Sequence, residues 1–413
     1  MSRNLATQFQ YQVPVEPAPG ADVFDKCRDF TLASEVREQG LYQYYREISS
    51  GQDPVVTIDG RELVMLGSNN YLGLASHPEV KEATIAAVEK YGTGCTGSRL
   101  LNGTLDIHVE LEERIAEFMN TESALVFATG YQVNLGVLSC LLGRRDVAIL
   151  DSLDHACIID GARLGFSKIV KFAHNDMDDL AAKLERINPE LGRLIVVDGV
   201  YSMEGDLCEL PRLVELAKTH GARIMVDDAH GLGVFGRHGR GVAEHFGLED
   251  DVDLVMGTFS KSFATTGGFI AGDESIIGYI KHHARSAIFS AACSPSSAAT
   301  VLAAMDICER EPERRALLWE NTRYMKRELQ AMGYDTGESA SPIVPMLVGE
   351  DLRCFEMVTR LHDLGVFVNP VITPAVEPGR AMLRSSYMAT HTREHLDRGL
   401  EAFATVGREF GII

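Results

Sequence analysis

Lys261 lies in a short loop rich in hydroxyl side chains, directly after an apolar run. The loop 257–262 has the sequence GTFSKS, it follows the run Asp253–Met256, and a pair of glycines comes soon after it. A lysine amine attacks a carbonyl group when it is neutral, and partial desolvation favours that neutral form. The pattern therefore suggests a lysine that carries a carbonyl cofactor, whereas the ordinary alternative is a solvated loop lysine.

Asp227 closes a second apolar run, and His230 follows three positions later in the segment 224–230, IMVDDAH. Burying a carboxylate without a partner is costly. The protonated ring nitrogen of pyridoxal phosphate (PLP) is a suitable partner, because this ion pair keeps the ring an electron sink. His230 could hydrogen-bond to the ring oxygen or transfer a proton. The alternatives are an aspartate that caps the next turn and a histidine with a structural role.

Two further segments would complete such a site. His155 follows the apolar run Val147–Leu150, and its imidazole could stack on a planar ring. Gly130 precedes an apolar helical stretch, where backbone N–H groups and the helix dipole form an anion site suited to a phosphate. Each signal is weak alone. Together with Lys261 and Asp227, they are the parts that a PLP site requires.

The elements that must position these residues alternate between short apolar runs and amphipathic helical stretches. This alternation predicts an α/β fold with a mostly parallel central sheet flanked by helices. Ligands bind beyond the carboxyl ends of such strands, which is where the reactive residues fall. The predicted strands are Val147–Leu150, Leu194–Val197, Ile224–Val226, Leu254–Met256 and Gly267–Ala271, with helices at Met177–Ile187 and Leu210–Thr219.

The chain is predicted to have three parts. Residues 1–60 form an N-terminal arm and helix, residues 61–295 a large cofactor-binding domain, and residues 296–413 a smaller C-terminal α+β domain. Within them we expect an irregular arm to about residue 25, a helix between Phe24 and Ser50, a hairpin over Val55–Met65, and strands at Ile343–Leu347 and Val366–Val368.

Composition excludes several classes of function. The 413 residues carry a formal charge of −20, which disfavours nucleic acid as a partner. The eight cysteines show no C-x-x-C pair and no zinc spacing, so we expect no metal site and a reduced, cytoplasmic protein. The uncharged stretch 123–143 contains polar and turn residues, so we interpret it as strand, turn and helix rather than as a membrane span. No signal peptide is recognised.

Several ordered motifs resemble the α-oxoamine synthase family of fold-type I PLP enzymes, and they span nearly the whole chain. They are SNNYLG at 68–73, GTGCTGSR at 92–99, DH at 154–155, YSM at 201–203, DDAH at 227–230, GTFSKS at 257–262 and LRSS at 383–386. The resemblance implies a decarboxylative condensation of an amino acid with an acyl thioester to give an α-amino ketone. It also implies a homodimer with shared active sites.

The resemblance assigns roles by position. Lys261 would hold PLP as a Schiff base and move the α-proton of the amino acid. Asp227 would pair with the ring nitrogen, His155 would stack on the ring, and His230 would face the ring oxygen. The remaining implied contacts are Ser202 at the ring oxygen, Gly130, Tyr131, Thr258 and Ser260 around the pyridine and phosphate, Ser290 at the partner subunit's phosphate, and Asn70 and Arg384 at the substrate carboxylate.

The segment 97–104, GSRLLNGT, is most similar to bacterial serine palmitoyltransferases, which favours L-serine and a long-chain acyl-CoA. Two departures from the motifs of relatives leave glycine and L-alanine open as the amino acid. Acyl-carrier-protein thioesters are open as the acyl donor. Residues 372–374 are ITP where several relatives have Arg-Pro-Pro, and Cys95-Thr96 stands where some serine-using relatives have Thr-Asn. An aminotransferase and a non-catalytic partner subunit are the alternatives from other classes.

Overall fold

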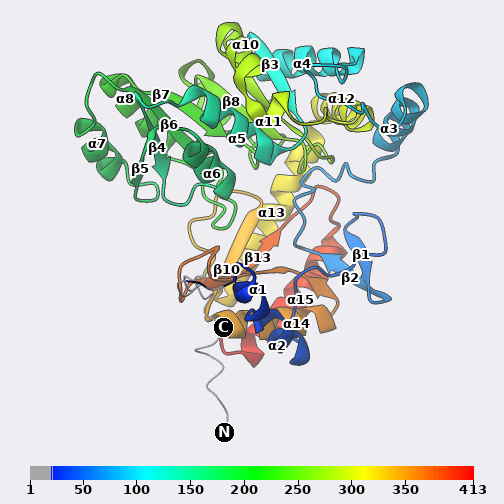
Figure 1. The fold of residues 1–413 in the computed structure, drawn as a ribbon. Helices are drawn as coiled ribbons and strands as arrows, with labels where there is room; N and C mark the ends of the chain where they lie inside the picture. The colour runs from blue at the N-terminus through cyan, green and yellow to red at the C-terminus, as the bar shows by residue number, and fades with distance from the viewer. Residues whose placement is uncertain (1–19, 21) are drawn as a thin grey trace. The chain divides into compact units, whose positions relative to one another are not determined.

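Seven strands form the central sheet of the larger of two units in this computed structural model, which describes residues 20 and 22–413 (Figure 1). β9 runs antiparallel to both of its neighbours, and the other adjacent pairs are parallel. The predicted mostly parallel sheet is therefore confirmed. The strands in sheet order are β3 (Ser123–Phe127), β9 (Gly268–Gly272), β8 (Leu254–Thr258), β7 (Arg223–Asp227), β6 (Gly192–Asp198), β4 (Asp146–Asp151) and β5 (Lys168–Phe172).

Helices cover both faces of this sheet because its strands are apolar on both sides. In β3, Leu125 and Phe127 pack in one core with α5 (Gly130–Leu141), α6 (Ala156–Leu164) and α10 (Glu274–His283). Ala124 and Val126 alternate with them and pack in a second core with other helices. Two buried faces explain the continuous apolar runs in the sequence. The helices of the second core are α3 (Pro78–Tyr91), α4 (Asp106–Met119) and α12 (Pro295–Arg310).

The larger unit comprises residues 69–319 and 388–390. Its other helical segments are α7 (Met177–Glu185), α8 (Leu210–His220), α9 (Val242–Phe246), η2 (Glu249–Asp251), α11 (Arg285–Ile288) and the start of α13 (Glu313–Met332). The predicted strand and helix within 123–143 are confirmed as β3 and α5. No helix among the described residues is long and apolar enough to cross a bilayer.

The smaller unit joins the described part of residues 1–68 to residues 320–387 and 391–413. The predicted hairpin is present as β1 (Val55–Ile58) and β2 (Arg61–Met65), and β2 pairs in parallel with β11 (Val366–Phe367). A second sheet has the order β10-β13-β12. Its strands are β10 (Ile343–Gly349), β13 (Ala381–Ser386) and β12 (Asn369–Val371), and the helices of this unit are α1 (Asp25–Arg28), α2 (Leu32–Glu38), the rest of α13, α14 (Asp351–Asp363) and α15 (Arg393–Glu409).

The unit boundaries differ from the predicted part boundaries at 60/61 and 295/296. The chain divides at 68/69 and 319/320 because β2 pairs with β11, and because α12 packs into the core of the larger unit. Between Phe24 and Ser50, helix ends at Glu38, so the predicted helix is shorter than expected. Whether the predicted parts are independent domains stays a prediction. The predicted arm falls largely on residues 1–19 and 21, outside the described residues.

An ion cluster joins the loops that follow β4, β5 and β6. The His174 ring contacts Asp151 Oδ1 at 3.0 Å through Nδ1 and Asp206 Oδ2 at 2.8 Å through Nε2. Burial alone would lower the pKa of His174, but its hydrogen bonds to the two carboxylates raise the pKa to about 10. A protonated imidazole suits this position between two carboxylates, because only the protonated ring donates from both of its nitrogens. It therefore ties together three loops at the carboxyl edge of the sheet.

A His174→Gln variant should be less stable than the native chain at pH 6, by about 2 kcal/mol, because a charged hydrogen-bonding group is lost. A raised folded-state pKa contributes stability that is complete below about 6.5 and disappears as the pH rises through about 10. The difference should therefore shrink between those values. Urea unfolding at pH 6, 8 and 10 measures it, and a difference that stays constant would contradict the charged state.

Gly161 allows α6 to lie directly against α5. A Cβ atom at Gly161 would lie 2.5 Å from the backbone oxygen of Asn134, whereas a Cβ at Gly278 on α10 would meet open space. Gly161→Ala should lower the free energy of unfolding by about 1–3 kcal/mol through overpacking. Gly278→Ala, the matched control, should raise it by up to about 1 kcal/mol through helix propensity. Urea denaturation compares the two, and equal behaviour would show that the helices can separate without cost.

Candidate active site

The carboxyl ends of the parallel strands carry most of the predicted site residues. Asp227 is the last residue of β7 and Thr258 the last of β8, whereas His155 lies in the loop after β4 and Ser202 in the turn after β6. Because the ends of β4, β6, β7 and β8 share one edge of the sheet, the fold gathers segments that lie up to about a hundred positions apart in the sequence.

Asp227 is buried, with 3% of its surface exposed, and both of its oxygens accept hydrogen bonds. Oδ2 accepts from the Asn134 side-chain amide at 2.6 Å, and Oδ1 accepts from the backbone N–H of Ala229 at 3.1 Å. These neutral donors fix the carboxylate without supplying a compensating charge. A cationic ring N–H at this position would supply that charge, as the prediction for Asp227 requires.

Lys261 is half-buried in the loop between β8 and β9. The loop is fixed by hydrogen bonds from the Phe259 N–H to the Gly267 carbonyl at 3.0 Å and from the Ser262 hydroxyl to the Leu232 carbonyl at 2.7 Å. Because β8 runs parallel to β7 and this loop follows the carboxyl end of β8, Lys261 lies at the same edge of the sheet as Asp227.

His155 caps α6 with its side chain. Its ring Nδ1 accepts from the Cys157 backbone N–H at 3.2 Å. The backbone N–H of His155 donates to Asp198 Oδ2 at 2.7 Å. His155 is exposed as a whole residue, but desolvation of its ring by the surrounding groups lowers its pKa, partly offset by the Asp227 charge. The ring is therefore held neutral and in one orientation, which suits stacking on an aromatic cofactor. Tyr131 meets it edge-on, with ring centroids 6.4 Å apart.

His230 lies after β7, where its Nδ1 is 2.7 Å from the hydroxyl of the fully buried Tyr71. The residues of the SNNYLG motif thus reach the loop that follows Asp227. Tyr71 was not predicted as a site residue, and the motif itself was the only signal in the sequence that could have indicated it.

The start of α5 forms a cradle suited to an anion. A Cβ atom at Gly130 would lie 2.6 Å from Thr258 Oγ1, so the two segments approach as closely as only glycine allows. The first N–H groups of a helix have no carbonyl partner within it. The Ser260 hydroxyl lies 3.0 Å from that of Thr258. Ser290, which was predicted to contact the partner subunit's phosphate, accepts from the Gln132 side-chain amide of its own chain at 3.1 Å. Amides and hydroxyls are the donors that a phosphate needs, and together with Asp227 and Lys261 they fit PLP.

Additional buried carboxylates at this edge were missed by the sequence analysis. Burial and the Asp227 charge raise the pKa of Asp198, and burial and the Asp198 charge raise that of Asp154. Burial also raises the pKa of Asp228 to about 7. Asp154 and Asp228 adjoin predicted site residues in the sequence, but residue type alone gives no measure of burial.

The two predicted substrate-binding residues are not brought together within one unit. Asn70 is buried in the larger unit, where its Oδ1 accepts from the backbone N–H groups of Leu74 at 3.0 Å and Ala75 at 3.3 Å. Arg384 is buried on β13 in the smaller unit. Their role in binding a carboxylate stays a prediction.

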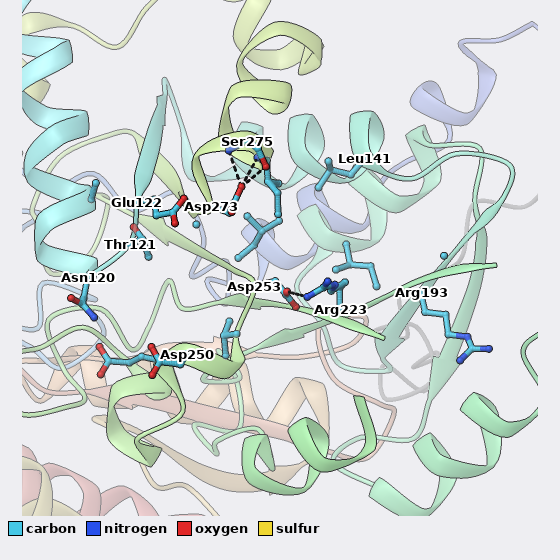
Figure 2. A pocket seen from close by; sticks show the side chains of 18 of the residues that line it. Asn120, Thr121, Glu122, Leu141, Arg193, Arg223, Asp250, Asp253, Asp273 and Ser275 are labelled. Atoms are coloured by element: carbon cyan, nitrogen blue, oxygen red, sulfur yellow. Dashed lines mark hydrogen bonds and ion pairs between the residues drawn. The ribbon is translucent and has the colours of Figure 1, made fainter. Parts of the chain in front are cut away.

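A groove of about 960 Å³ lies at the opposite edge of the sheet, beside the amino ends of the parallel strands (Figure 2). Asp146, Arg193 and Arg223 line it at the beginnings of β4, β6 and β7. Arg223 is paired there with Asp253 at 2.7 Å. None of the predicted site residues lines this groove, so its size does not make it the candidate active site.

Comparisons with known proteins agree with this arrangement. A family model described as aminotransferase class I and II matches residues 61–403. A serine palmitoyltransferase of Sphingobacterium spiritivorum is 51% identical over 385 residues, which cover 93% of this chain and 96% of that protein. An 8-amino-7-oxononanoate synthase of Symbiobacterium thermophilum is 46% identical over 379 residues, with coverage of 92% and 97%.

Among solved structures, a serine palmitoyltransferase from S. paucimobilis with a PLP–myriocin adduct bound has a TM-score of 0.92 and 37% identity, covering 95% of this chain and all of that one. The sequence and the fold of this chain thus match those of these proteins along nearly the whole length. The chain belongs to the aminotransferase class I and II family and, within it, to the α-oxoamine synthases of fold type I.

Proposed function

We propose that this chain is a PLP-dependent acyltransferase that condenses L-serine with a long-chain acyl-CoA, releasing CO2 and the free thiol and giving a 3-ketosphinganine-type α-amino ketone. One observation carries the proposal: four groups come together at the carboxyl edge of one sheet. They are Lys261, the buried Asp227, the neutral His155 and the start of α5 at Gly130. Similarity to serine palmitoyltransferases over more than nine-tenths of the chain supports the substrates.

The chain's own groups would act as follows. PLP, when bound, supplies an electron sink for negative charge at the amino acid's α-carbon. Lys261 would hold the cofactor through its Nζ and then take the α-proton and return it to the product. Asp227 would hold the proton on the ring nitrogen. His155 would cover one ring face, and the Gly130 end of α5 would bind the phosphate.

The remaining residues would orient the substrate and the cofactor. We assign His230 and Ser202 to the ring oxygen, and the hydroxyls of Thr258 and Ser260 to the phosphate. Tyr131 directly follows Gly130, is 41% exposed and is hydrogen-bonded to Asp160, which supports a position for it at the rim of the same cradle. The proposed contacts of Asn70 and Arg384 with the substrate carboxylate rest on the family motifs.

We also propose a cytoplasmic homodimer in which Ser290 reaches the partner subunit's phosphate. Exposed apolar side chains beside that loop support an interface there. Leu101 is 80% exposed and Phe289 is 74% exposed. The two segments that carry them are joined by a hydrogen bond from the Ala292 N–H to the Gly97 carbonyl at 2.9 Å.

Glycine or L-alanine, with an acyl-CoA or an acyl-carrier-protein thioester, is the second candidate. The similarity to 8-amino-7-oxononanoate synthases at 46% identity favours keeping it, because the catalytic residues alone do not select the amino acid. An aminotransferase would instead form a keto acid and release neither CO2 nor thiol. A non-catalytic subunit is disfavoured by the presence of Lys261 and Asp227.

Lys261→Ala should reduce thiol release from acyl-CoA in the presence of L-serine by about a thousandfold or more, because one side chain both carries the cofactor and moves the proton. Circular dichroism should show an unchanged fold. Lys281→Ala, at an exposed lysine on α10, is the matched control and should retain activity. Appreciable turnover in the Lys261 variant would remove the central claim.

Titrating the PLP-loaded protein with L-serine, glycine, L-alanine and L-threonine should shift its visible absorption band with L-serine. A shift with another amino acid alone would keep the reaction and overturn the substrate. Absence of any Schiff-base band after adding PLP would exclude the enzyme and favour the non-catalytic subunit.

A further inference from the structure

Asn134 lies between two of the proposed cofactor contacts. It is on α5, none of its surface is exposed, and its Nδ2 donates to Asp227 Oδ2 at 2.6 Å and to Cys157 Sγ at 3.0 Å. The sequence analysis assigned no role to either Asn134 or Cys157.

The orientation of the Asn134 amide is fixed by its neighbours. Turning it over would place its oxygen against the Asp227 carboxylate, where two acceptors would repel each other. In the observed orientation Asn134 Oδ1 is buried and has no hydrogen-bond partner among the described residues. An unsatisfied buried acceptor costs free energy. An apolar side chain would avoid this cost but would leave Asp227 Oδ2 without its donor, so the asparagine is explained by what it donates to that carboxylate.

The same network reaches His155. Cys157 Sγ lies 2.8 Å from His155 Nδ1, and the close approach of α6 to α5 at Gly161 brings Cys157 within reach of Asn134. A continuous path of contacts therefore runs from Asp227 through the buried Asn134 and Cys157 to the ring of His155, which is exposed.

We propose that Asn134 is a positioning residue that holds the Asp227 carboxylate in place for the ring nitrogen of PLP. The inference rests on the proposed function. With Oδ2 held by Asn134 and Oδ1 held by the Ala229 N–H, the carboxylate cannot rotate without breaking one of the two bonds. Its remaining lone pairs then have one fixed direction.

The test is a double-mutant cycle in which the measured quantity is the dissociation constant of PLP. It is obtained for each variant by titrating the apoprotein with PLP. Asn134→Leu has a similar volume and no donor, and should weaken PLP binding about tenfold, as expected for loss of a hydrogen bond to a charged group. Asp227→Ala removes the group that Asn134 is proposed to orient. The double variant should then bind PLP within about threefold of Asp227→Ala alone.

A merely structural asparagine would behave differently, because its loss would weaken binding in both backgrounds. Thr300→Val is the matched control, since it removes a buried hydroxyl 2.6 Å from Thr84 that joins α12 to α3. It should lower the thermal midpoint and leave PLP binding unchanged. If Asn134→Leu does not fold, Asn134→Ser replaces it in the same cycle, because its hydroxyl is too short to keep the 2.6 Å contact.

The outcomes separate this inference from the proposed function. A native chain that does not bind PLP overturns both. Two outcomes would overturn only the role of Asn134, provided that the native chain binds PLP. One is an unchanged PLP dissociation constant in Asn134→Leu. The other is a tenfold weakening of PLP binding that persists when Asp227 is already replaced by alanine. Loss of the penalty in the Asp227→Ala background supports it.

Discussion

Negative charge buried at the carboxyl edge of one sheet is the constraint on which the rest of the structure depends. Asp151, Asp198 and Asp227 end neighbouring strands and are all buried. Like charges repel strongly in a region of low dielectric, so such a cluster requires donors and cations around it or carboxyl groups that keep their protons. The loops after the strands supply backbone N–H groups and the His174 imidazolium, and burial beside the Asp227 charge raises the pKa of Asp198.

This compensation also explains why an acidic protein can hold an anionic cofactor. With a net charge of −20, the chain offers no general attraction for a phosphate. The favourable field must be local, and the start of α5 provides it through the helix dipole and the N–H groups that the helix itself leaves unpaired. Gly130 is required there because any side chain would displace Thr258. The proposed phosphate contact and the packing of α5 against β8 therefore depend on the same close approach.

The sequence predicted the sheet well because strands buried on both faces leave continuous apolar runs, and the reactive residues follow those runs directly. It predicted less where pairing is distant. The pairing of β2 with β11 and the packing of α12 against α3 and α4 join segments far apart in the sequence, and no periodicity indicates them. β5 was not predicted because its burial is partial and two of its five residues, Lys168 and Lys171, are exposed lysines. Periodicity reports which face of an element is buried, but not which partner buries it.

The site shows the same division between local and distant information. Asp227, Lys261 and His155 could be named from the sequence because their types are chemically distinctive and follow strand ends. Asn134 could not be named, because an asparagine inside an apolar helix has no distinctive chemistry until its contact with Asp227 at the end of β7 is known. Substrate choice is further removed still. The motifs depart from the expected pattern at Cys95-Thr96 and at residues 372–374, and neither segment contains Lys261, Asp227 or His155, so the residues of the proposed mechanism do not by themselves select the amino acid.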